Sequence, residues 1–124
     1  MRFAHLALGT RDASRLSRFF ESTLGWSVVE PPNDPRARLI WLEIAPGEQI
    51  HLIEVEGFEP LRSEAEYGRH FAFKHPKDDF EALKARLQDA GAEIIAAQRP
   101  TAFARFFFRV EDGYMFEVIE DSNS

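Results

Sequence analysis

The sequence contains no cysteine, and this absence excludes several kinds of protein. Without thiols there is no disulfide framework and no thiolate metal site, and nothing favours an oxidising compartment. Any metal must therefore be bound by histidine, aspartate or glutamate side chains.

Long apolar runs and an excess of positive charge are also missing. No stretch approaches the roughly 20 apolar residues that cross a bilayer, and the opening MRFAHLALGTRD lacks the apolar run of a signal peptide. The formal net charge of −6 opposes binding to a phosphate backbone, which requires a basic face. We therefore expect a cytoplasmic protein that binds neither membranes nor nucleic acid.

What the sequence does contain is typical of one globular domain. Its 124 residues are 44% hydrophobic and 29% charged, which is ordinary for a folded protein of this size. The chain is long enough to bury a core without covalent staples.

The first half of the chain predicts the element order βαβββ. Residues 3–8 form an apolar run that ends at Gly9, and Asp12 precedes an amphipathic helix that ends at Gly25. Three further strands are predicted, with a turn at Pro46-Gly47 before the last of them: residues 26–30, 38–44 and 49–56. Prolines 31, 32 and 35 exclude regular structure between the first two of these.

The second half predicts the same order. Residues 68–74 form a strand, Asp78 and Glu81 form a capping box at the start of a helix, and Gly91 ends that helix. Three strands follow, with a turn at Asp112-Gly113 before the last: residues 92–96, 105–110 and 114–120.

Corresponding residues in the two halves keep one register. The separation is 70 − 5 = 65 for two histidines, 91 − 25 = 66 for two glycines, and 117 − 51 = 66 for His51 and Glu117. The register predicts an α+β domain spanning 1–124, made of two tandem βαβββ modules (1–56 and 68–121) that are joined by a linker and hinge at 57–67.

Four titratable residues interrupt apolar strands: His5 in FAHLAL, His51 in QIHLIEV, His70 in GRHFAF and Glu117 in YMFEVIE. Any one alone is more often a hydrogen-bonded core residue, and we expect the fold to cover His5. Four of them related by a repeat favour a shared role, and imidazole with carboxylate suits a divalent metal. Four protein ligands in a six-coordinate shell leave two adjacent positions for water or a bidentate substrate. The ligand types do not distinguish Zn, Ni, Co, Fe and Mn.

These motifs, together with the helix DDFEALKARLQDAGAEII and the final EDGYMFEVIE, resemble the vicinal oxygen chelate superfamily over nearly the whole chain. That superfamily includes glyoxalase I, bleomycin-resistance proteins, fosfomycin-resistance proteins and extradiol dioxygenases. The resemblance implies a curved, cup-shaped mixed β-sheet around one divalent metal bound by His5, His51, His70 and Glu117. It also implies a homodimer.

The chain departs from particular members in ways that narrow the resemblance. Glyoxalase I has a glutamate where this chain has His51, so a glyoxalase-like member is favoured over a strict glyoxalase I. Fosfomycin-resistance proteins surround the metal with serine, lysine and arginine, whereas AFARFFFRV offers aromatic residues with Arg105 and Arg109. Extradiol dioxygenases are longer and use three protein ligands.

The function that the resemblance implies is a metal-dependent lyase or isomerase. A small substrate would chelate the metal through neighbouring oxygens, and the metal would stabilise an enediolate. Glu117 would be the catalytic base that removes the adjacent proton. Three alternatives stay open: a dioxygenase of the same superfamily, a non-catalytic small-molecule binding protein of the bleomycin-resistance type, and a purely structural metal site.

Other aromatic and basic residues are weaker candidates for lining the substrate cavity. Strand alternation sends some of the phenylalanines at 103, 106, 107 and 108 to the core, so none is named as a site residue. The arginines at 38, 99, 105 and 109 are candidates for binding a carboxylate, although surface arginines are common.

Overall fold

The structure is a computed structural model that describes residues 1–29 and 38–122. Glu30, at the end of a predicted strand, and the predicted proline-rich loop at 31–37 lie outside the described residues. The chain divides into two compact units, Met1–Glu59 and Pro60–Ser124, which we call the N-terminal and C-terminal units and describe separately. The boundary falls inside the segment 57–67.

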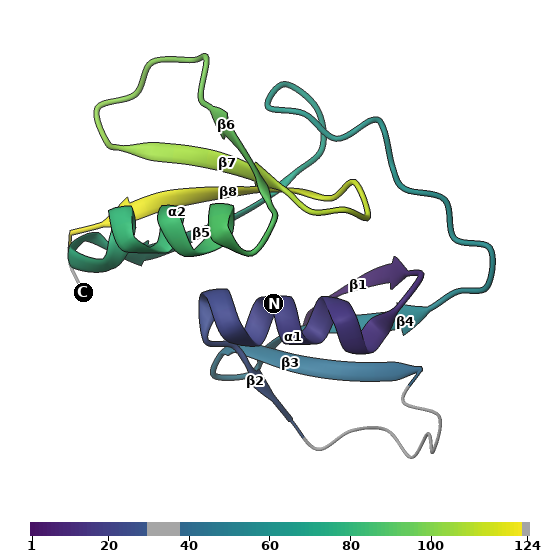
Figure 1. The fold of residues 1–124 in the computed structure, drawn as a ribbon. Coiled ribbons are helices and arrows are strands. Elements are labelled where there is room, and N and C mark those ends of the chain that lie inside the picture. The colour runs from purple at the N-terminus through teal and green to yellow at the C-terminus, as the bar shows by residue number, and fades with distance from the viewer. Residues whose placement is uncertain (30–37, 123–124) are drawn as a thin grey trace. The chain divides into compact units, whose positions relative to one another are not determined.

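The N-terminal unit has the predicted βαβββ order. Its elements are β1 (His5–Thr10), α1 (Ala13–Leu24), β2 (Ser27–Val28), β3 (Leu39–Ala45) and β4 (Glu48–Glu54). The strands form one open four-stranded sheet in the order β1-β4-β3-β2, in which β1 runs parallel to β4 and the other pairs are antiparallel. Helix α1 covers one face of this sheet (Figure 1).

Helix α1 has the ends that the sequence predicts. The side chain of Asp12 accepts a hydrogen bond from the backbone N–H of Arg15, and Gly25 ends the helix with a φ of 72°. The helix packs its apolar side against every second residue of the central strands. The core of the unit is formed by Leu8, Leu16, Phe20, Leu42, Ile50 and Leu52.

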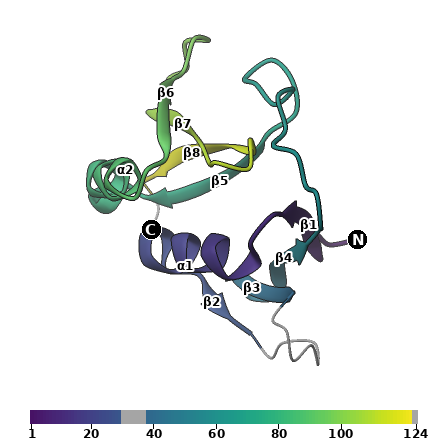
Figure 2. The ribbon, with the colours of Figure 1, turned by 45° about the vertical axis from the view of Figure 1, so that its right-hand side comes forward.

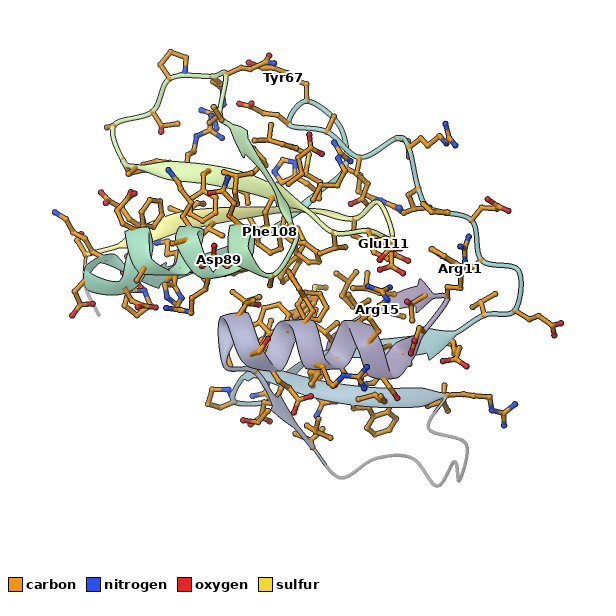
Figure 3. The ribbon with its side chains drawn as sticks, viewed as in Figure 1. Arg11, Arg15, Tyr67, Asp89, Phe108 and Glu111 are labelled. Atoms are coloured by element: carbon orange, nitrogen blue, oxygen red, sulfur yellow. The ribbon has the colours of Figure 1, made fainter. Side chains whose placement is uncertain are left out.

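Gly9 does not end β1, as the sequence suggested, because the strand continues to Thr10. Gly9 pairs with Ile53 in the sheet, and a Cβ at this position would lie 3.3 Å from the ring of Phe58. The glycine therefore serves close packing rather than a turn. Arg11, labelled in Figure 3, donates to the carbonyl of Phe58 and holds this segment beside the end of β1.

The C-terminal unit repeats the topology of the first. Its elements are β5 (Phe71–Pro76), a 3₁₀ turn (Lys77–Asp79), α2 (Phe80–Asp89), β6 (Glu93–Ala96), β7 (Arg105–Arg109) and β8 (Met115–Asp121). The sheet order β5-β8-β7-β6 matches that of the first unit, with β5 parallel to β8. In Figure 2 helix α2 is seen nearly end-on against one face of this sheet. The prediction of two tandem βαβββ modules with an α+β fold is confirmed, and each sheet is open.

Phenylalanines dominate the core of this unit. The ring of Phe80 on α2 meets that of Phe106 at 5.2 Å between centroids, and Phe108 stacks on Phe116 at 5.0 Å. Phe108 is labelled beside α2 in Figure 3. Alternation along β7 turns Phe107 to the opposite face. The expectation that strand alternation sends some of these phenylalanines to the core is thus confirmed.

Two local predictions in this unit are wrong. The predicted capping box of Asp78 and Glu81 does not form, because α2 begins at Phe80 after a 3₁₀ turn. Asp79 rather than Asp78 is the N-cap residue, and its side chain makes no capping bond. Its carboxylate instead accepts hydrogen bonds from Arg86 and His75. Strand β5 begins at Phe71, so His70 precedes the strand rather than lying within it.

Among the described residues, no helix is long and apolar enough to span a bilayer.

Candidate metal centre

Two of the four predicted ligands lie together in the N-terminal unit, on the sheet face that α1 leaves uncovered. His5 begins β1, and His51 lies on the adjacent strand β4. Their imidazole rings stack with centroids 4.0 Å apart, and Trp41 stacks on the other face of His51 at 4.3 Å. His5 is exposed, contrary to expectation, because β1 is an edge strand and α1 covers only its other face.

Gln49 shares this face and engages His51. The Nε2–H of His51 donates to Oε1 of Gln49 at 2.8 Å, which leaves Nδ1 as the unprotonated nitrogen of the neutral ring. Burial and the nearby charge of His5 both lower the pKa of His51 from its ordinary 6.5. The neutral imidazole, which is the form that binds metals, is therefore favoured.

The other two predicted ligands lie together in the C-terminal unit. Nε2 of His70 is 3.1 Å from Oε1 of Glu117, and Nδ1 of His70 is 3.1 Å from the carbonyl oxygen of Ala65. Both side chains are largely covered, at 19% and 9% exposure. Glu117 lies on the central strand β8, on the sheet face opposite α2.

The second carboxylate oxygen of Glu117 is held by a buried arginine. Nη1 of Arg105 lies 3.1 Å from Oε2 of Glu117, and Nη2 lies 2.8 Å from Oε2 of Glu66. Nη2 also donates to the carbonyl of Arg99. Burial alone would lower the pKa of Arg105, but hydrogen bonds to Glu66 and Glu117 raise it, so the guanidinium stays charged.

Glu66 is the outer member of this chain of charges. Its carboxylate also accepts the backbone N–H groups of Gln98 and Arg99, at 2.7 and 2.9 Å. Desolvation pushes the pKa of Glu66 upward, but these two bonds and Arg105 outweigh it and lower the pKa to about 2. Glu66 is therefore an anion at any pH near neutrality.

Residues 60–69, which we call the strap, lead into β5 and are drawn in teal in Figure 1. Leu61 donates its N–H to the carbonyl of Asp112, and the carboxylate of Glu64 accepts the N–H of Met115. Gly113, with a φ of 92°, allows the backbone of Leu61 to lie against the β7–β8 turn. The strap thus carries Ala65 and Glu66 to the site, although most of it belongs to the segment predicted as a linker. Tyr67, labelled in Figure 3, is its exposed tip.

The His70–Glu117 pair fits a divalent metal. Nδ1–H of His70 donates to a carbonyl, so the neutral ring has a lone pair on Nε2, and that lone pair faces a carboxylate oxygen. Two acceptors at this distance require a proton or a metal cation beside them. Two neighbouring ligands of one octahedral metal, each bonded at about 2.1 Å and at right angles to each other, are separated by about 3.0 Å, close to the 3.1 Å between these atoms.

The His5–His51 pair fits a metal after one local change. Lone pairs of imidazoles lie in the ring plane, so two stacked rings direct no nitrogen at each other. A metal shared by His5 and His51 would have to lie at the edge of the stack. His51 would then bind it either through Nε2, after Gln49 releases that nitrogen, or through Nδ1. Across residues 1–29 and 38–122, no group of three or more histidine and acidic side chains is close enough to hold a metal.

The structural repeat extends to the aromatic residue beside each pair. Trp41 is paired with His51 across β3 and β4, and Phe107 is paired with Glu117 across β7 and β8, a separation of 107 − 41 = 66. Trp41 stacks on His51, whereas Phe107 meets His70 edge-on at 5.1 Å between centroids. Each half-site therefore combines one aromatic residue with two candidate ligands.

Sequence reasoning did not identify Glu66 or Gln49, and it named Arg105 only as one of several arginines. In the structure Phe107 is paired with Glu117, so Arg105, two residues before Phe107 on β7, shares the face of Glu117. A two-residue turn at Asp112-Gly113 would instead pair Phe107 with Val118 and place Arg105 on the other face, so the turn does not predict the role of Arg105. No sequence signal marks Glu66 either, because its role depends on the path of the strap.

Comparisons with solved structures give the same fold at low sequence identity. The fosfomycin-resistance protein FosX from Listeria monocytogenes, as its E126Q mutant complexed with Mn(II), is 20% identical over 95% of this chain and 88% of that chain, with a TM-score of 0.76. A glyoxylase/bleomycin resistance protein/dioxygenase domain from Frankia sp. EAN1pec is 20% identical over 100% and 94%, with a TM-score of 0.79. The oxidase ChaP-H2 is 22% identical over 98% and 94%, with a TM-score of 0.71.

A search of curated proteins finds no match. The family model described as Glyoxalase/Bleomycin resistance protein/Dioxygenase superfamily matches residues 2–118, which include all four predicted ligands. Sequence, topology and family model agree: the chain belongs to the glyoxalase/bleomycin resistance protein/dioxygenase superfamily.

Proposed function

We propose that this protein is a metal-dependent lyase or isomerase of the glyoxalase type, with His5, His51, His70 and Glu117 as ligands of one divalent metal. The observation that carries the proposal is the contact between two candidate ligand atoms, Nε2 of His70 and Oε1 of Glu117 at 3.1 Å. Ala65 fixes the tautomer that leaves Nε2 free to coordinate. A small-molecule substrate and a homodimer belong to the same proposal.

Further support comes from the family and from what its members bind. The superfamily includes glyoxalases, and the similar FosX structure is complexed with Mn(II). This chain has a histidine or carboxylate at each ligand position that the family implies. An enzyme is favoured over a binding protein because the ligand positions are intact.

In the proposed reaction a divalent metal would act as a Lewis acid on two neighbouring oxygens of the substrate. Glu117 would leave the coordination shell and accept the adjacent proton at Oε1, while Arg105 keeps Oε2 in place. His70 is oriented by Ala65, and Phe107 shields the site from water on the sheet side. The covered position of the Glu117 side chain, which is 9% exposed, suits a base that works on a desolvated substrate.

Metal binding is the first test. We expect the purified protein, stripped with chelator, to bind Mn(II), Co(II), Ni(II) or Zn(II) in calorimetry, and His5→Gln and His70→Gln to weaken binding about 10-fold or more. His75→Gln is the matched control, because His75 pairs with Asp79 outside the site. A protein with only trace metal, in which His5→Ala changes neither stability nor metal affinity, would refute the metal centre.

Proton abstraction is the second test. The metal-loaded protein is mixed with methylglyoxal and several thiols in deuterated water, and NMR follows both product and deuterium at the carbon that loses its proton. We expect turnover or exchange that Glu117→Gln abolishes. Metal binding without either result on any tested substrate would favour the non-catalytic binding protein, and oxygen uptake with Fe(II) would favour the dioxygenase.

A further inference from the structure

We propose that Arg105 and Glu66 are positioning residues for Glu117, which they hold so that only its Oε1 is presented beside Nε2 of His70. This inference rests on the proposed metal centre and extends it to two residues that do not touch the metal. It assigns the strap a direct role in the geometry of the ligands.

Arg105 suits this role because it is buried and donates to two carboxylates. Its side chain is 2% exposed, and its two terminal nitrogens bridge the carboxylates of Glu117 and Glu66 at 3.1 and 2.8 Å. A guanidinium has a planar fork of donors, so one side chain fixes two carboxylates relative to each other. Because Oε2 of Glu117 is occupied, the carboxylate can coordinate through Oε1 alone.

The burial of Arg105 indicates that its terminal nitrogens, and not only the packing of its side chain, account for an arginine at this position. Among the described residues its Nε is a buried donor with no hydrogen-bond partner. Leaving a buried donor unpaired destabilises a fold, and an apolar side chain of similar length would avoid this cost. An arginine is expected here only if the two terminal contacts are worth more than the unsatisfied Nε–H.

Glu66 fixes the other end of the arginine. Its carboxylate is tied by two backbone N–H groups, those of Gln98 and Arg99, so it is a rigid anchor rather than a loose surface charge. Ala65, the preceding residue, accepts from Nδ1 of His70. Two successive strap residues therefore orient both candidate ligands of this unit, one directly and the other through Arg105.

The direction in which metal affinity changes shows whether Arg105 acts by positioning Glu117 or only through its positive charge. Removing a positive charge near a cation site, without any loss of geometry, would tighten metal binding. Loss of positioning would weaken it, by about 10- to 100-fold for residues that orient ligands. Arg105→Met therefore gives opposite results under the two explanations.

The experiment measures Mn(II) and Co(II) dissociation constants of the full chain by calorimetry, together with the visible absorption spectrum of the Co(II) form. We expect Arg105→Met and Glu66→Gln each to weaken binding and to change the Co(II) bands, because Glu117 is then free to turn. Arg105→Lys keeps the charge without the fork and is expected not to restore the wild-type spectrum. Arg62→Met and Glu81→Gln are the matched controls, since both residues are exposed.

The double variant tests whether the two residues act as one unit. If Glu66 acts through Arg105, Glu66→Gln adds little to Arg105→Met, whereas independent effects add. Urea unfolding of each variant separates a loss of stability from a loss of geometry. Wild-type affinity and spectrum in a folded Arg105→Met protein, or tighter binding, would overturn the inference and leave the metal centre standing. Absence of metal binding by the wild type would overturn both.

Discussion

His70 and Glu117 meet through Nε2 and Oε1, which lie 3.1 Å apart, while Nδ1 of the same ring faces the carbonyl of Ala65. Glutamine at position 117 can resolve this contact without metal, because its amide can donate to Nε2 and accept from Arg105. We expect Glu117→Gln to lose the rise in melting temperature that metal gives the wild type. Its metal-free stability should change little.

Glu117→Ala is the comparison for this prediction. Alanine leaves one terminal nitrogen of the buried Arg105 without its acceptor, so we expect a loss of about 1–3 kcal/mol relative to Glu117→Gln. Differential scanning fluorimetry with and without metal, and urea unfolding of the metal-free proteins, provide the measurements. Equal destabilisation by the two substitutions would show that the carboxylate charge, rather than the hydrogen bonds, holds Arg105.

The order of helices and strands was predictable because the two halves of the chain have the same βαβββ pattern. Short-range signals, such as Asp12 and Gly25 at the ends of α1, act locally and predict its ends in the structure. The agreement of two halves in one register reduces the chance that both are misread. Strand ends were less predictable, since β1 continues through Gly9 to Thr10 by pairing with β4, which is distant in sequence.

The candidate site was predictable only in part, for a physical reason. Ligand types stand out when they interrupt apolar strands, as His51 and Glu117 do. Residues that orient ligands have no such pattern: Glu66 lies in a polar segment that looks like a linker until its contacts with Gln98 and Arg105 are known. Hydrogen bonds between residues this far apart in the chain cannot be predicted from the local sequence around either residue.

The strap should be sensitive to a single methyl group at Gly113. This residue has a φ of 92°, and a Cβ here would collide with the backbone of Leu61. Gly91→Ala is the matched control, with a φ of 99° and nothing within 4 Å of the added atom. We expect Gly91→Ala to cost about 1–2 kcal/mol from backbone strain, and Gly113→Ala to cost at least about 1 kcal/mol more from the collision.

Urea unfolding measures both glycine variants, and calorimetry with Mn(II) gives a second readout for Gly113→Ala. Because the collision displaces the strap, metal affinity should fall in this variant and stay unchanged in Gly91→Ala. Equal costs for the two substitutions would mean that Leu61 moves away freely and that the strap is not fixed against the β7–β8 turn.

Acid should destabilise the protein partly through Glu66. The pKa of this carboxyl is about 2 in the fold against an ordinary 4.5, so the unfolded chain binds the proton more tightly. The resulting stabilisation is fully present above 4.5 and is lost as the pH falls toward 2. We expect the free energy of unfolding of the wild type to fall more steeply with acid than that of Glu66→Gln.

The matched control for the acid experiment is Glu81→Gln, since Glu81 is 79% exposed and lies 3.9 Å from Lys84. Asp79, whose pKa is lowered by Arg86 and His75, contributes the same acid loss to all three proteins. Urea unfolding at a series of pH values gives the slopes. Parallel curves for the wild type and Glu66→Gln would contradict the tight binding of this carboxylate by Gln98, Arg99 and Arg105.

The histidine stack in the N-terminal unit makes a prediction for the metal-free protein. Burial, and to a smaller extent the positive charge of His5, lower the pKa of His51 below 6.5. Replacing His5 by glutamine removes the charge but leaves most of the burial, so the pKa of His51 should rise and still stay below 6.5. NMR titration of the imidazole carbon-bound protons in the presence of chelator measures the change, with His75→Gln as the control that should leave it unaltered. A fall in the pKa of His51 after His5→Gln would mean that His5 does not lower this pKa by charge repulsion. Stacking of the two rings would then govern the pKa of His51 instead.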